Sequence, residues 1–248
     1  MRNLPALTSR ELKSLWYSPV AYVVGALFLL LQGFVFWLLV AALNDPRSDA
    51  AFTIAQAFFG PTFFYSISVL ITVPFLTMRT FSEEKRTGSI ELLLTAPVTD
   101  AEVVLSKFLG AWTAYILLWA STIVFFLMLR SLTPFEWGPV WTGYLGTWLL
   151  GGVLISVGTL ASSLTRNQVI AAFLSFVILL LLFCVGILDW FFKDPETSRL
   201  IHYLSLLEHL TDFSKGIVDT RPMLYYLSVT AVALFLTGRV IGNPRWRS

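Results

Sequence analysis

Residues Arg79 to Glu102 read RTFSEEKRTGSIELLLTAPVTDAE, and this stretch decides how the chain is arranged. It holds eight charged residues, although the whole chain of 248 residues has only 17 Lys and Arg and 15 Asp and Glu. Long apolar runs enclose it on both sides. A charged connection between two uncharged runs is typical of a chain that crosses a membrane, turns in water and crosses back.

The composition agrees with a membrane location. The chain is 56% hydrophobic and 13% charged, with a mean hydropathy of +0.76, whereas a soluble domain has about 25% charged residues. A net charge of +2 without a basic stripe gives no case for nucleic acid as a partner. Cys184 is the only cysteine, which excludes an intrachain disulfide and a cysteine-cluster metal site. Glu11 and Lys13 precede any apolar core, so the N-terminus is interpreted as retained, not as a signal peptide.

Six segments are long enough to cross the bilayer, since about 20 apolar residues span about 30 Å as a helix. The predicted fold class is therefore an all-α integral membrane protein with six transmembrane helices. The expected spans are Val20–Leu43, Phe52–Met78, Val103–Leu129, Val140–Leu164, Val169–Leu188 and Met223–Ile241. Gly60 and Pro61 are expected to break the second span. Lys107 and Arg239 lie near span ends, where their side chains are expected to snorkel to water.

The distribution of basic residues predicts the orientation. Six spans put both termini on one side, and eleven of the 17 Lys and Arg then lie on that side. The short loops of the other side carry only Arg47 and Arg130. The positive-inside rule therefore predicts cytoplasmic termini, which makes residues 79–102 cytoplasmic as well.

Residues 1–19 are predicted to form a helix in the membrane interface. Thr8 to Glu11 has the pattern of a capping box, and Pro19 ends the segment. The apolar residues that recur at helical spacing are Leu12, Leu15 and Trp16. A simple topology anchor and a mechanical role both fit this helix.

Residues 79–102 have the pattern of a shaped corner. Gly88 follows a run of charges as a C-cap or hinge, and Ser89 is placed to cap the segment IELLLTA, which Pro97 ends. Thr99 and Glu102 form a second capping-box pattern, opening a helix that can run into the third span. A solvated loop with one helical turn is the alternative.

The connection 189–222 repeats apolar residues every three or four positions, which predicts an amphipathic helix or re-entrant hairpin at the outer face. His202 and His209 lack a third ligand nearby, so a metal site is not expected. The fourth span is rich in Gly and Ser, which favours either close packing within the chain or dimerisation.

The spans carry no charge at mid-membrane, where ion-driven transporters usually place one. The chain also has no phosphate-binding loop, nucleophile elbow or H-E-x-x-H helix. Active transport would therefore need energy from a partner, and residues 79–102 are the cytoplasmic feature shaped to receive it.

The run FSEEKRTGSIELLLTAPVTDAEVVLSKFLGAW resembles the intracellular signature of type-2 permeases of the ATP-binding-cassette (ABC) superfamily. The later run LSLLEHLTDFSKGIVDTRPMLYYLSVTAVALFLTG resembles the branch that includes gliding-motility permeases. The resemblance covers nearly the whole chain. It implies one permease domain over 1–248, with an interfacial N-terminal helix, a coupling segment at 79–102 and a re-entrant outer segment before the sixth span.

The resemblance implies the transmembrane subunit of an exporter in a bacterial inner membrane. Two permease chains, identical or related, would pair over two ATPase subunits, which would bind ATP and Mg, and this chain would itself hold no cofactor. The resemblance leaves open whether the complex contains an additional membrane or periplasmic subunit. The implied coupling residues are Glu83, Glu84, Lys85, Arg86, Thr87, Gly88 and Glu91, with Ser89, Thr99 and Glu102 as helix caps.

Two other classes of function are alternatives. A membrane scaffold would bind a cytoplasmic ATPase or motility complex without moving anything, and a membrane enzyme would need a nucleophile, base or metal set that the pattern does not supply. For Glu83 and Glu84 the plain alternative is a surface ion pair, which contributes about 0–1 kcal/mol. The substrate stays open among polypeptide, polysaccharide, lipid and small ions.

Overall fold

The computed structural model describes residues 4–43, 54–89, 99–131, 135–190 and 194–242, and throughout these ranges the regular structure is helical. By length and composition, five helices of the described chain could cross a membrane. They are α2 (Pro19–Leu43), α4 (Phe63–Thr77) extended through α5 (Ser82–Thr87), α7 (Asp100–Ser121) with α8 (Ile123–Arg130), α9 (Gly138–Ser163) and α13 (Thr220–Gly242).

The segment predicted as the fifth span is divided in two. Its first part is α10 (Gln168–Cys184), which has 17 residues, and its second is the 3-10 helix η1 (Val185–Trp190). The α-helix alone is shorter than the about 20 residues that a span needs. The count of six spans therefore stays a prediction.

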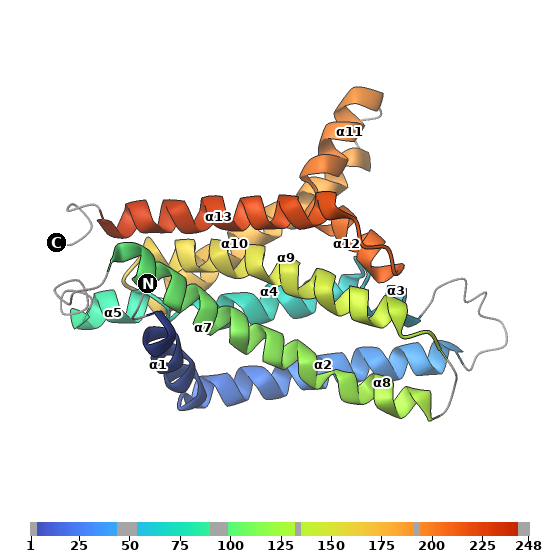
Figure 1. The fold of residues 1–248 in the computed structure, drawn as a ribbon, viewed down its shortest axis with the longest axis horizontal. Helices are drawn as coiled ribbons and strands as arrows, with labels where there is room; N and C mark the ends of the chain where they lie inside the picture. Colours follow the sequence, from blue (N-terminus) through green and yellow to red (C-terminus); the bar gives the residue numbers. More distant parts are fainter. Residues whose placement is uncertain (1–3, 44–53, 90–98, 132–134, 191–193, 243–248) are drawn as a thin grey trace.

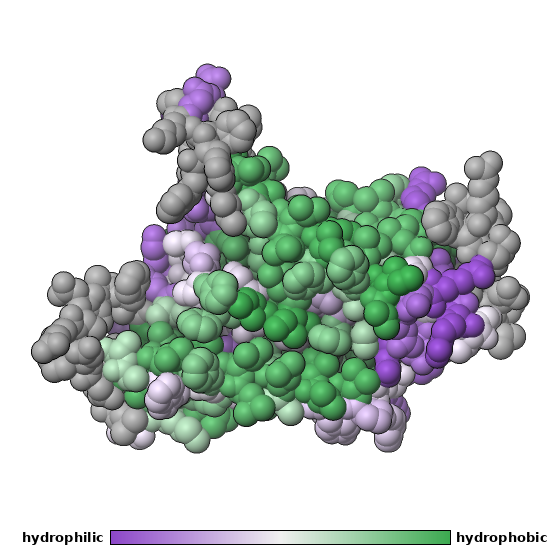
Figure 2. All heavy atoms as spheres, turned by 180° about the vertical axis from the view of Figure 1, so that it is seen from behind, coloured by the Kyte–Doolittle hydropathy of each residue, from purple (hydrophilic) through white to green (hydrophobic). Residues whose placement is uncertain are grey.

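The helices form an elongated bundle (Figure 1). The first helix, α1 (Leu4–Trp16), lies at one end together with α5, the start of α7 and the end of α13. The short helix α3 (Ile54–Phe59), α8 and α12 (Leu206–Ser214) lie toward the opposite end, and α11 (Pro195–Leu204) projects sideways. Figure 2 shows a hydrophobic surface along the bundle, with hydrophilic residues gathered at the α5 end.

Two breaks divide the long apolar runs. Gly60 and Pro61 separate α3 from α4, as the sequence predicts, and the Thr62 hydroxyl caps α4 by accepting from the Tyr65 N–H. The second break, at Thr122 between α7 and α8, was not predicted. The Thr122 hydroxyl lies 2.7 Å from both the Trp119 carbonyl and the Tyr144 hydroxyl. Bonding back to its own helix in this way is typical of Thr where a helix bends.

The capping box predicted at Thr8 is wrong. Helix α1 begins at Leu4, with Pro5 in its first turn, where a missing N–H costs nothing. The Thr8 hydroxyl therefore lies inside the helix and donates to the Leu4 carbonyl at 2.9 Å. Glu11 does not reach back to the Thr8 backbone, and it faces Lys107 of α7 instead.

Helix α9 lies in the centre of the bundle, and several of its glycines lie in close contact with side chains of other helices. A Cβ added at Gly151 would lie 2.1 Å from the Tyr115 ring, and one at Gly158 would lie 2.4 Å from the Thr77 hydroxyl oxygen. The same crowding holds at Gly143 against Phe59. The sequence left close packing within the chain and dimerisation as two interpretations of this Gly-rich span, and these contacts support close packing.

The connection before α13 forms two helices, α11 and α12, where an amphipathic helix or a re-entrant hairpin was predicted. Ser205 separates α11 from α12 and caps α12 by accepting from the Glu208 N–H. The buried face of α12 includes Leu206, Leu210 and Phe213. His202 lies 3.6 Å from Glu208, and the His209 ring contacts the Tyr203 carbonyl at 3.1 Å, so the two histidines have separate partners.

Candidate functional site

The charged stretch of the sequence begins with α5, whose end is fixed by one glycine. Gly88 has a φ of 74° and ends α5 in the left-handed conformation, which a side chain at this position would strain. A Cβ added there would meet nothing within 4 Å, so the backbone conformation alone requires glycine. The predicted C-cap is present.

Lys107 of α7 is the centre of an ion-pair network that includes α5. Its side chain is only 2% exposed, and its ammonium lies 2.8 Å from Glu84 Oε1 and 3.4 Å from Glu11 Oε1. It also lies 5.2 Å from the centre of the Phe81 ring. The prediction that Lys107 snorkels to water is therefore wrong, because α1 and α5 cover it with two carboxylates.

The chain allows this arrangement because α1 lies directly on α7. A Cβ added at Gly110 would come within 2.9 Å of Glu11 Cβ, so only glycine leaves room for the crossing. Arg10, the neighbour of Glu11, lies 3.0 Å from Glu11 and 3.8 Å from Glu84. Two cations and two carboxylates thus join α1, α5 and α7, and the formal charges of the network balance.

Helix α9 is joined through hydrogen bonds to the corner that α1, α5 and the start of α7 form. The buried Ser162 hydroxyl accepts from the backbone N–H of Phe81 at 3.1 Å and of Ser82 at 3.2 Å, and donates to the Met78 carbonyl. These two N–H groups belong to the start of α5, where backbone donors lack helical partners. Lys85 of α5 donates to the backbone carbonyl of Ser163. The start of α5 is therefore fixed to the end of α9.

The outer part of the corner is more accessible. The Arg79 guanidinium donates to the Ser18 hydroxyl at 2.8 Å and lies 4.0 Å from the Glu83 carboxylate. The Glu83 side chain is 44% exposed, compared with 20% for Glu84. The two neighbouring glutamates thus have different surroundings: Glu84 lies in the network, and Glu83 lies at its edge.

A capping box fixes the start of α7. The Thr99 hydroxyl accepts from the Glu102 N–H at 3.3 Å, and the Glu102 carboxylate accepts from the Thr99 N–H at 3.1 Å. Both bonds satisfy backbone donors that the first turn of a helix leaves free. The sequence predicts this pair, and the structure contains it.

The remaining candidate residues lie outside the ion-pair network. Arg86 and Thr87 are exposed, and the Thr87 hydroxyl contacts the Glu83 carbonyl at 3.0 Å and the Ser89 hydroxyl at 2.9 Å. Glu91 and the segment that Ser89 was expected to cap lie outside the described residues. The sequence did not predict that Glu11 and Lys107 belong to the ion-pair network, or that Ser162 bonds to the start of α5. Gly110, three residues after Lys107, was the available signal, because a small residue there lets a second helix approach.

Long apolar helices in one bundle, with a charged corner at one end, define a multi-pass membrane protein. A family model described as ABC-2 family transporter protein matches residues 43–238. The chain belongs to this family, whose members are the membrane-embedded permease subunits of ABC transporters and associate with ATPase subunits. The matched region includes α5 and Lys107, whereas α1 precedes it. A search of curated proteins finds no match.

Proposed function

We propose that this chain is the pathway-forming subunit of an ABC exporter, and that the ATPase drives it through the corner formed by α5, α1, α7 and the end of α9. The observation that carries the proposal is Lys107. It is a buried cation held by carboxylates from two other helices. Burying a charge costs several kcal/mol unless it is paired, so α5, α1 and α7 gain stability by keeping their relative positions.

This arrangement can transmit a movement from one helix to others. A force on α5 would act on α7 through Glu84 and Lys107, and on α9 through Ser162. The capping box at Thr99 keeps the first turn of α7 formed while the force acts. ATP-driven closure of the ATPase subunits would then shift these helices as a group and open or close a path between two permease chains.

The finer features of the proposal follow the resemblance in the sequence. The chain would cross a bacterial inner membrane six times with cytoplasmic termini, α1 would lie in the interface, and α11 and α12 would form the outer re-entrant segment. Two ATPase subunits would hold ATP and Mg, and a second permease chain would complete the path. The same proposal places the chain in the gliding-motility-like branch and includes an accessory subunit. It assigns no substrate.

The test isolates the left-handed end of α5. The tagged chain is purified from its native membranes, and the ATPase subunit that co-purifies is quantified together with its hydrolysis rate. Gly88→Val forces a β-branched side chain into a left-handed conformation, whereas Gly88→Asn places there a residue that tolerates it. We expect Gly88→Val to lower hydrolysis at least tenfold or to release the ATPase, and Gly88→Asn to retain most of both.

Two results would contradict the proposal. If no ATPase subunit co-purifies with the wild-type chain, the chain is not driven in this way. If the ATPase co-purifies and hydrolyses ATP equally fast with the wild-type chain and with a variant that combines Gly88→Val, Glu83→Ala and Glu84→Ala, the corner does not couple. A chain that binds the ATPase without any effect on hydrolysis would be a scaffold.

A further inference from the structure

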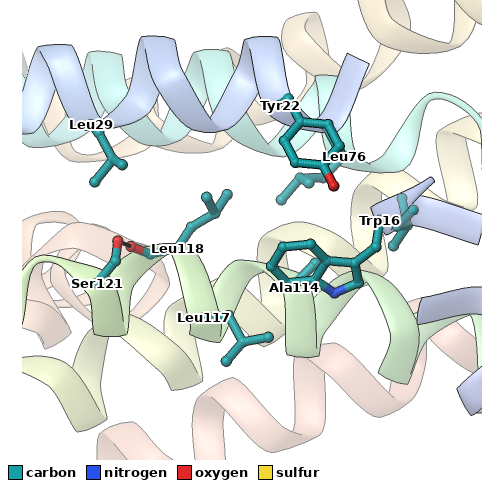
Figure 3. Close-up of a pocket in the computed structure, with 10 residues that line it drawn as sticks. Trp16, Tyr22, Leu29, Leu76, Ala114, Leu117, Leu118 and Ser121 are labelled. Atoms are coloured by element: carbon teal, nitrogen blue, oxygen red, sulfur yellow. Dashed lines mark hydrogen bonds between the residues drawn. The ribbon is translucent and has the colours of Figure 1, made fainter. Parts of the chain in front are cut away.

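Two adjoining cavities lie beside α1 at the α5 end of the bundle. The first is a groove of about 240 Å³ with a mostly apolar lining. Side chains from α2 line one side and side chains from α7 the other, with Trp16 at one end (Figure 3). Tyr22 is 63% exposed and Leu117 is 45% exposed, so the groove opens on the outer surface of the bundle.

The length of this groove fits an acyl chain. On α2 the lining of the groove begins at Ala21, and Leu29 lies eight residues further along the helix. At 1.5 Å per residue this distance is about 12 Å, which is most of the hydrocarbon depth of one leaflet, half of about 30 Å. The groove therefore covers most of the depth that one lipid tail occupies.

The second cavity supplies charge at the end of the groove. Its volume is about 340 Å³, and Leu15 lines both cavities. The accessible charges of this cavity are Arg79, 34% exposed, and Glu83, 44% exposed. Lys107, 2% exposed, and Glu84, 20% exposed, also line the cavity and are paired with each other. Arg79 and Glu83 are therefore the more exposed cation and anion of the cavity, and they lie side by side.

We propose that the two cavities together bind one phospholipid with an ethanolamine headgroup. Its acyl chain lies along the groove, its phosphate at Arg79 and its ammonium at Glu83. An ethanolamine ammonium can donate hydrogen bonds to a carboxylate, whereas a choline headgroup has no N–H to donate. The net negative phosphatidylglycerol headgroup would meet the like charge of Glu83. The site goes beyond the proposed function, since it requires neither an ATPase nor a particular sidedness.

The test uses the chain alone, reconstituted in phosphatidylcholine vesicles. A minor fraction of the lipid carries bromine on its acyl chain, which quenches nearby tryptophan, and has an ethanolamine, choline or glycerol headgroup. The difference between the wild type and Trp16→Phe isolates the quenching of Trp16 at the groove. We expect the ethanolamine lipid to associate about three- to fivefold more strongly than the choline lipid, the effect of a partly exposed ion pair. The glycerol lipid should associate most weakly.

Variants and salt decide whether the headgroup is recognised. Glu83→Gln should abolish the preference, while Glu136→Gln, at an exposed position just before α9, should keep it. In the wild type, added salt should reduce the preference, because exposed charges are screened. Equal quenching by the three lipids would mean ordinary bilayer contact and overturn the proposal. A preference that survives both Glu83→Gln and added salt would overturn it as well.

Discussion

At the α5 end of the bundle, ion pairs and hydrogen bonds join the helices, whereas at the other end aromatic rings pack against glycines. The Phe59 ring lies 4.7 Å from Tyr144 and 5.6 Å from Phe126, between centroids. A Cβ added at Gly146 would lie 2.6 Å from Phe213 Cβ. Lys107, in contrast, is held by two carboxylates at 2.8 and 3.4 Å.

The two kinds of contact respond differently to movement. Close-packed rings lose contact energy at a shift below 1 Å, and they have no alternative partners within the core. Ion pairs among several charges can exchange partners, since Arg10 and Lys107 both contact both Glu11 and Glu84. We therefore expect the contacts at the α5 end to tolerate a small shared displacement of the helices better than the close-packed rings at the other end.

The largest expected effect is at the centre of the charged end. Lys107→Met leaves Glu84 and Glu11 without their buried cation, and removing one partner of a buried pair costs about 3–5 kcal/mol. Lys13→Met, at an exposed position of α1, is the control and should cost less than about 0.5 kcal/mol. The measurement is unfolding in mixed micelles with increasing SDS. Equal midpoints for the two variants would show that the network does not hold this end.

The next effect tests the packing of α9. Gly151→Ala forces a methyl group to within 2.1 Å of the Tyr115 ring, so we expect a loss of about 1–3 kcal/mol from overpacking. Gly152→Ala, one residue along, meets its nearest atom at 3.6 Å and should be neutral or slightly stabilising. The same unfolding measurement compares them. If both variants were equally stable, the centre of the bundle would be looser than its contacts show.

A smaller effect is expected at the start of α7. Thr99→Ala removes the hydroxyl that caps the helix, which typically costs about 1 kcal/mol. Thr113→Ala is the matched control, because the Thr113 hydroxyl bonds only the Leu109 carbonyl of its own helix. Amide hydrogen exchange over residues 100–106 should rise for Thr99→Ala alone. Unchanged exchange would mean that other contacts fix this first turn.

The smallest loss of stability is expected at Glu83, and its neighbour Glu84 is the comparison. Glu83→Ala should change stability by about 0–1 kcal/mol, because its pair with Arg79 is long and exposed. Glu84→Ala should cost more, since it removes the nearest partner of Lys107. Unfolding in low and in high salt checks the difference, because only the exposed pair should be sensitive to salt. A larger loss of stability for Glu83→Ala than for Glu84→Ala would contradict the conclusion that Glu84 lies inside the network and Glu83 at its edge.

Local signals predicted several parts of the site correctly. Gly88 ends α5, Thr99 and Glu102 form a capping box, and Gly60 and Pro61 break the second apolar run. Each of these features is decided within about one helical turn, by backbone donors, by φ or by a missing N–H. The cap predicted at Thr8 failed, because Pro5 offered an earlier start and Glu11 found a partner far along the chain.

The sequence by itself determined that the protein is helical and membrane-bound, and that its charge gathers in one connection, because hydropathy and helix periodicity are properties of single segments. The tertiary structure alone decided that Lys107 is buried, that Glu11 pairs with it across 96 positions, and that three glycines of α9 face aromatic rings, namely Gly143, Gly146 and Gly151. Such contacts depend on how helices cross, and a crossing is fixed only when the side chains of both helices pack together.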